Sequence, residues 1–138
     1  MYEIKDRVCA SRTASNGKMK LTGALEIIQD CSLLWLESEP SFRSYLTVKN
    51  LGMFIVSRQV DIVRLPVYHE RITVQTRIFD CNGFLGYRNT ALYGEDGLPC
   101  LLTWGLGLFV NMDTGKMVRV PQNVIGDITI NSKIEMEY

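Results

Sequence analysis

A single helical pattern followed only by β patterns strongly limits how this chain can fold. Over residues 21–37, apolar side chains recur at the three- and four-residue spacing of a helix. From about residue 51 onward, long segments of β character are separated by glycine-containing turns. One sheet that buries a face against one helix must curl around it. We therefore expect an α+β fold in which a curved antiparallel sheet wraps a long central helix.

Five strands are expected to form that sheet. They span residues 2–10, 51–63, 70–79, 84–93 and 98–111. Pro40 is expected to end the helix, and a loop through about residue 50 leads into the second strand. Asn82-Gly83 has the residues of a tight hairpin turn. Because one helix cannot cover strands of this length, we expect a homodimer whose sheets join edge to edge, and leave open whether two dimers form a tetramer.

The last strand carries bulky apolar side chains on one face. They occupy its even-numbered positions from Leu102 to Val110, Trp104 among them. We expect this face to lie against the helix, which is the only cover available. Gly105 and Gly107 would then lie on the opposite face, where they either ease the curvature of the strand or make room for a ligand.

Length, charge and cysteine spacing exclude several classes of protein. The 138 residues suffice for one ordinary core, so we expect a single domain over 1–138. Fifteen basic residues balance fifteen acidic ones, which disfavours a nucleic-acid partner. No apolar leader and no run of about 18 apolar residues is present, which predicts a cytoplasmic protein without membrane insertion. Four widely spaced cysteines and one histidine predict reduced thiols and no metal site.

Several short motifs resemble the acyl-ACP (acyl-carrier-protein) thioesterases of plants and bacteria. Arg12-Thr13-Ala14-Ser15 resembles the segment that enters the helix in that family, and Ile28-Gln29-Asp30-Cys31-Ser32 resembles a run inside the helix. Val56-Ser57-Arg58 and Arg64-Leu65-Pro66 resemble the family's second strand and the turn after it. With further matches up to Pro121, the resemblance covers about residues 2–126. It implies the hotdog fold, in which the sheet wraps the helix.

The resemblance also implies an activity, which is the hydrolysis of a fatty-acyl thioester on ACP or CoA by water, without a cofactor. The chain resembles the N-terminal hotdog half of the plant enzymes, whose catalytic residues lie in the C-terminal half. Related single-hotdog thioesterases carry an acid and a histidine before the helix, where this chain has Ala14 and Lys18. A non-catalytic acyl-binding or scaffolding hotdog protein is therefore the alternative. A hotdog dehydratase is disfavoured, because His69 has no matching acidic motif.

Polar residues before and within the helix are the candidates for catalysis. Asn16-Gly17 leads into the helix, where backbone N–H groups point outward and could hold an oxyanion. The same dipeptide is equally typical of an ordinary turn. Gln29 and Asp30 could orient the attacking water, although Asp30 also fits a solvated surface acid.

Apolar and basic residues supply the candidates for substrate binding. Arg58 belongs to a set of arginines in the strand segments that could help to dock an acidic carrier protein. The large side chains would line the acyl site, and they are equally typical of a core. The predicted substrate-binding residues are Leu25, Ile28, Met53, Arg58 and Trp104.

Overall fold

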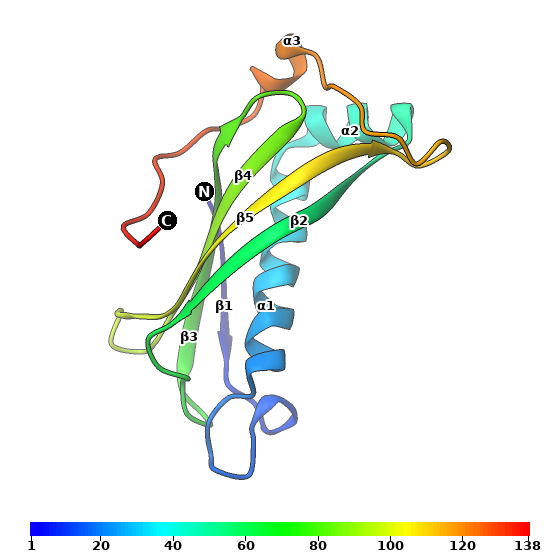
Figure 1. Ribbon diagram of the computed structural model, residues 1–138. Helices are drawn as coiled ribbons and strands as arrows, with labels where there is room; N and C mark the ends of the chain where they lie inside the picture. The colour runs from blue at the N-terminus through cyan, green and yellow to red at the C-terminus, as the bar shows by residue number, and fades with distance from the viewer.

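The computed structural model describes all 138 residues and shows a five-stranded sheet that curves around one long helix (Figure 1). In chain order the strands are β1 (Tyr2–Arg7), β2 (Leu51–Ile62), β3 (Arg71–Cys81), β4 (Leu85–Tyr93) and β5 (Pro99–Asn111). The helices are α1 (Leu21–Leu34), α2 (Pro40–Lys49) and α3 (Gln122–Ile125), with 3₁₀ turns at Ala10–Arg12 and Trp35–Ser38. The predicted helix and curved sheet are confirmed.

Every pair of neighbouring strands is antiparallel, and the spatial order is β1-β3-β4-β5-β2. β1 and β2 are therefore the two edges of the sheet. β2 pairs along its length with β5 and carries a bulge between Ile55 and Ser57. None of the helices has the length and apolar composition needed to cross a lipid bilayer.

The segment between α1 and β2 is a second helix, and the predicted loop there is wrong. The helical segment of α1 and its 3₁₀ turn ends at Ser38, just before Pro40. Pro40 also begins α2, where its missing N–H would have had no helical partner. Asn50 ends α2 in a left-handed conformation with φ of 53°. The buried side chains of Phe42 and Leu46 anchor α2 on Trp35 and the far ends of the strands.

β5 turns the opposite face toward α1 from the one predicted. Leu101, Thr103 and Phe109 are buried on the helix side, whereas the even-numbered residues from Leu102 to Val110 are only partly buried on the outer face. The C-terminal segment covers part of that outer face, and the rings of Trp104 and Tyr138 lie 5.8 Å apart. Gly105, which the sequence placed away from the helix, therefore faces α1, and so does Gly107.

Two hydrophobic clusters follow the axis of α1. The first packs α1 residues such as Ile27 and Ile28 against β1, β3, β4 and β5. The second joins Trp35 and α2 to β3, β5 and the segment that contains α3. Within the first cluster, burial raises the pKa of the Cys31 thiol to about 11, so this cysteine is a neutral core residue.

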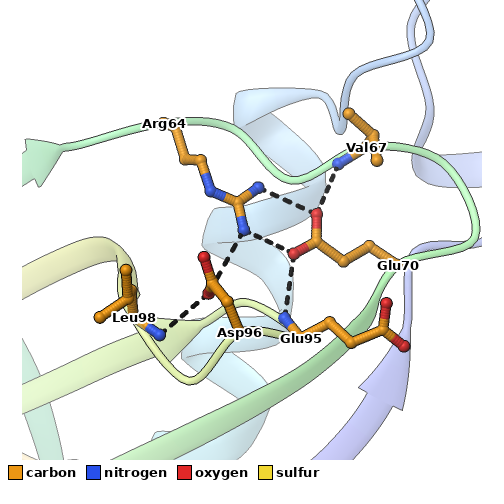
Figure 2. A network of polar contacts seen from close by, with 6 residues as sticks. All are labelled: Arg64, Val67, Glu70, Glu95, Asp96 and Leu98. Carbon is orange, nitrogen blue, oxygen red and sulfur yellow. Dashed lines mark hydrogen bonds and ion pairs between the residues drawn. The ribbon is translucent and has the colours of Figure 1, made fainter.

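An ion pair ties the β2–β3 connection to the β4–β5 turn (Figure 2). Arg64 donates two hydrogen bonds to the buried carboxylate of Glu70, at 2.9 and 2.6 Å. The backbone N–H groups of Val67 and Glu95 donate to the same carboxylate, at 3.1 and 3.0 Å. These bonds outweigh the cost of burial and lower the pKa of Glu70 to about 2. A side chain at Gly94 would collide with Arg64 and Glu70.

We expect Glu70→Gln to lower the free energy of unfolding at neutral pH by about 2–3 kcal/mol, since the carboxylate is bound far more strongly than in the unfolded chain. Because the folded pKa lies below the unfolded value, this stabilisation is complete above about pH 5 and is lost as the pH falls towards 2. Urea unfolding of both proteins across this range measures the difference. Glu95→Gln is the control, because the Glu95 carboxylate points away from the network (Figure 2). A wild-type advantage that does not shrink with acidification would contradict this account.

Candidate functional site

A small, mainly apolar cavity lies between α1 and the inner face of β2, β4 and β5. Its volume is about 100 Å³. Met53, Ile78 and Phe109 supply apolar walls, and Gln29, Ser32 and Leu33 contribute from α1. No Asp, Glu or His is among the lining residues. The cavity therefore suits an apolar group, with a few polar side chains at defined positions.

Three glycines create this space. Gly86 of β4 pairs with Gly107 of β5, and the neighbouring pair is Arg88 with Gly105. A Cβ atom added at Gly86 would meet nothing within 4 Å. At Gly105 and Gly107 it would meet only a backbone carbonyl oxygen, at 3.5 and 3.4 Å. Side chains would fit at all three positions, so their absence leaves open space beneath α1.

Two guanidinium groups, those of Arg58 and Arg88, line this cavity without a carboxylate partner. Arg88 donates a hydrogen bond to Thr76 Oγ1 at 2.8 Å, and its Cζ lies 4.7 Å from the centre of the Trp35 ring. No ion pair is formed by Arg88 anywhere in the structure. Burial is the main reason that the pKa of Arg88 falls to about 10, and the positive charge of Arg58 adds to the effect.

A chain of hydroxyl groups holds Arg88 in place. Ser32 donates to the carbonyl oxygen of Ile28, and its Oγ lies 3.2 Å from Thr90 Oγ1. Thr90 Oγ1 in turn lies 2.9 Å from Thr76 Oγ1, which accepts the hydrogen bond from Arg88. Ser32, Thr76 and Thr90 are all buried. The network fixes the position of the guanidinium from both α1 and β3.

Gln29 and Arg58 connect the cavity with a shallow groove on the exposed side of α1. Arg58 donates to Gln29 Oε1 at 3.0 Å, and both residues line the cavity and the groove. Burial lowers the pKa of Arg58. Leu25, Glu26 and Asp30 are among the other residues of the groove. A carboxylate thus lies beside the cavity on the neighbouring surface, although none lines it.

The structure brings together five of the predicted site residues. Gln29, Met53 and Arg58 line the cavity, while Leu25 and Asp30 line the adjoining groove. They come from α1 and β2, whose sequences are separated by α2.

The other predicted site residues lie elsewhere. Ile28 is completely buried in the first hydrophobic cluster. Trp104 lies on the outer face of the sheet, where its indole N–H donates to Gln59 Oε1 at 3.0 Å. Asn16 and Gly17 form an exposed turn before α1, in which the Gly17 N–H donates to Ala14 O and Asn16 Oδ1 accepts the Lys18 N–H. Gln29 is eight residues beyond the start of α1, about 12 Å along its axis.

Arg88 and Gly86 were not predicted as site residues, whereas Gly105 and Gly107 were considered as room for a ligand, but on the face away from the helix. The sequence showed Arg88 as one of several arginines in strand segments, and as one of the positions that resemble the acyl-ACP thioesterases. Its contact with the cavity follows from the pairing of β4 with β5, which places Arg88 opposite Gly105. Alternation along β4 puts Gly86, Arg88 and Thr90 on one face, which was the only local signal available.

Comparison with known proteins identifies the family. The model of the acyl-ACP thioesterase N-terminal domain matches residues 2–128. The chain belongs to this family. No curated protein sequence matches it.

Solved structures share the fold of this domain at low sequence identity, and the arrangement is the hotdog fold. An acyl-ACP thioesterase from Bacteroides thetaiotaomicron is 15% identical with a TM-score of 0.86, over 99% of this chain and 56% of that one. The probable thioesterase YbaW from Escherichia coli is 16% identical with a TM-score of 0.83, over 92% of this chain and 96% of that one. The 12:0-ACP thioesterase from Umbellularia californica is 12% identical with a TM-score of 0.83, over 97% of this chain and 56% of that one. This acyl-ACP thioesterase N-terminal domain thus spans about half of the two acyl-ACP thioesterase chains.

Gly105→Val is expected to fill the cavity without unfolding the domain, because the added Cβ meets only Ser57 O at ordinary contact distance. Replacement of a strand glycine by a β-branched residue also favours the strand, by about 0.5–1 kcal/mol. Urea unfolding and the binding of a CoA thioether with a five-carbon chain are the two measurements. If the cavity holds an acyl chain, we expect stability to be retained and binding of this test ligand to fall at least tenfold, with Gly105→Ala in between. Unchanged binding by a folded Gly105→Val protein would show that the ligand lies elsewhere.

Proposed function

We propose that this domain hydrolyses a fatty-acyl thioester carried on ACP or CoA, as part of a homodimer of hotdog domains. The observation that carries the proposal is the cavity beneath α1, which glycines keep open and which meets the surface at Gln29 and Arg58. An acyl chain placed there leaves its thioester carbonyl at these two polar side chains. Membership of the family and the thioesterases of the same fold support this choice.

The residues at this opening fit the direct attack of water. Gln29 Oε1 accepts a hydrogen bond from Arg58, which leaves the Gln29 amide N–H groups to donate to the thioester carbonyl oxygen. Asp30 takes a proton from a water molecule, whose oxygen then bonds to the carbonyl carbon. The C–S bond breaks, the proton passes to the departing sulfur, and a carboxylic acid and a free thiol result.

Asn16 and Gly17 remain part of the proposal as an oxyanion site of the assembled dimer. Within one chain they precede the N-terminal end of α1, whereas Gln29 lies about 12 Å further along the helix axis. They could act on the carbonyl group only if the second copy presents its own turn to this cavity. The carrier, whether ACP or CoA, contacts the basic side chain of Arg58 in this arrangement.

A second hotdog copy would bind along β2. This edge strand is unpaired on one side, and the consecutive apolar residues Phe54, Ile55 and Val56 are 48%, 52% and 57% exposed. A long apolar edge is a template for strand pairing. Joining two such edges continues one sheet across both copies, and it covers the exposed side chains beside the cavity.

Val56→Lys is expected to prevent this association, since a charge would be placed in the strand-to-strand contact. Sedimentation measurements should then show a dimer for the wild-type protein and a monomer for the variant. Val48→Lys is the matched control, because Val48 is 78% exposed on α2, away from β2. A wild-type monomer at micromolar concentration, or a Val56→Lys dimer, would contradict the proposed interface.

Release of free thiol from a panel of acyl-ACP and acyl-CoA thioesters tests the hydrolysis directly. Asp30→Asn is expected to lower kcat by about 10²- to 10⁴-fold, the usual contribution of a general base, with little change in KM. Asp127→Asn, which replaces an exposed acid far along the chain from the groove, should keep wild-type activity. The absence of turnover above the uncatalysed rate for every thioester would refute the hydrolase.

One observation favours a second function, which is acyl binding without hydrolysis. The cavity itself is lined by no acid and no histidine, so catalysis depends on the neighbouring groove. Native mass spectrometry with acyl-CoA separates the two functions. A stable acyl-CoA complex with no thiol release identifies a binding protein, and thiol release that is lost in Asp30→Asn identifies the enzyme.

A further inference from the structure

The positive charge at the cavity is larger than a plain acyl chain would require. Arg58 and Arg88 both line it, and they are close enough for the charge of Arg58 to lower the pKa of Arg88. Neither side chain pairs with a carboxylate. Placing a guanidinium against apolar walls is costly unless an anion compensates it. The molecule itself supplies no such anion at this position.

Part of the Arg88 guanidinium has no protein partner. A guanidinium carries five N–H donors, and the protein supplies one acceptor, Thr76 Oγ1. No fully buried side-chain nitrogen or oxygen in the structure lacks a hydrogen-bond partner. The other guanidinium nitrogens of Arg88 therefore reach open space, and the cavity is the space that Arg88 lines. The Trp35 ring and the hydroxyl network hold these donors in a fixed orientation.

We propose that the cavity selects a short acyl chain that ends in a carboxylate, bound by the free N–H groups of Arg88. This inference rests on the function proposed above, because it assumes that the acyl chain enters the same cavity. The chain enters past Gln29, its methylene groups pack against Met53 and Phe109, and its terminal carboxylate meets Arg88.

The dimensions and chemistry of the cavity favour this substrate class. A volume of about 100 Å³ suits a chain of a few carbons. A carboxylate can accept two parallel hydrogen bonds from one guanidinium, and such charge-assisted bonds are the strong ones. The lining offers no acid that would repel the anion. Arg58, nearer the groove, adds a second positive charge that favours an anion over a neutral chain.

Two non-hydrolysable thioether analogues of CoA test the inference, one with a pentyl chain and one with a 4-carboxybutyl chain. They match in length and differ in the terminal carboxylate. Titration calorimetry on the wild-type protein measures both dissociation constants, and no turnover complicates the result. We expect the carboxylated analogue to bind at least tenfold more tightly.

Arg88→Met tests the role of the guanidinium, since methionine fills similar space without charge. We expect the tenfold preference to fall below about twofold, mainly through weaker binding of the carboxylated analogue. Arg88→Lys should keep only part of the preference, because the positive charge remains but the bidentate hydrogen bonding to the carboxylate is lost. Arg77→Met on β3, where Arg77 donates to Ser132 O away from the cavity, is the control and should bind both analogues like the wild type.

The outcomes separate the two proposals. Equal binding of both analogues, or tighter binding of the pentyl chain, overturns the carboxylate preference and leaves the acyl site intact. Failure of both analogues to bind overturns the acyl site and the preference together. A preference that survives in a folded Arg88→Met protein also overturns the inference, because another group would then bind the carboxylate. The comparison of the two analogues on the wild-type protein is decisive even if a variant fails to fold.

Discussion

The fold depends on enclosing a largely apolar helix with one curved sheet. α1 has buried residues along its whole length, and only the inner face of the sheet, with α2 and the C-terminal segment, is available to cover them. Most inner positions of the strands carry side chains that fill the space against α1. Gly86 near the start of β4, with Gly105 and Gly107 inside β5, leaves that space empty. The cavity is thus a local interruption of the same packing that stabilises the domain.

The polar groups near this cavity divide into two kinds. Glu70 and Arg64 satisfy each other at the end of the sheet, so they stabilise the chain connections. Arg88 is held by Thr76 and Trp35 but has no anion of its own. The Arg64–Glu70 pair stabilises the fold, whereas Arg88 keeps N–H donors that no group of the free protein accepts. That difference is why the Arg64–Glu70 pair is assigned a structural role and Arg88 a role in recognition.

Features that depend on local sequence patterns were predicted correctly, whereas features that depend on contacts between distant parts of the chain were not. The spacing of apolar residues predicted α1, and the Asn82-Gly83 turn predicted the β3–β4 hairpin. Pro40 is compatible with either the end or the first turn of a helix, so α2 was missed. The inner face of β5 was assigned wrongly because its even-numbered side chains are bulky and apolar, and such side chains were expected to be buried against α1. In the structure the C-terminal segment covers part of that even-numbered side. The position of Arg88 depends on strand register, which no local pattern gives.

Of the site, the sequence supplied the two residues of the opening and one wall of the cavity, but neither Arg88 nor the face on which the glycines lie. Gln29, Arg58 and Met53 were named from motifs and chemistry, and they do meet. A crystal structure with the pentyl thioether analogue of CoA tests the central claim most directly. We expect the chain carbons between α1 and the three glycines, with the sulfur near Gln29. A chain bound on the outer face, with the space beneath α1 still empty, would contradict it.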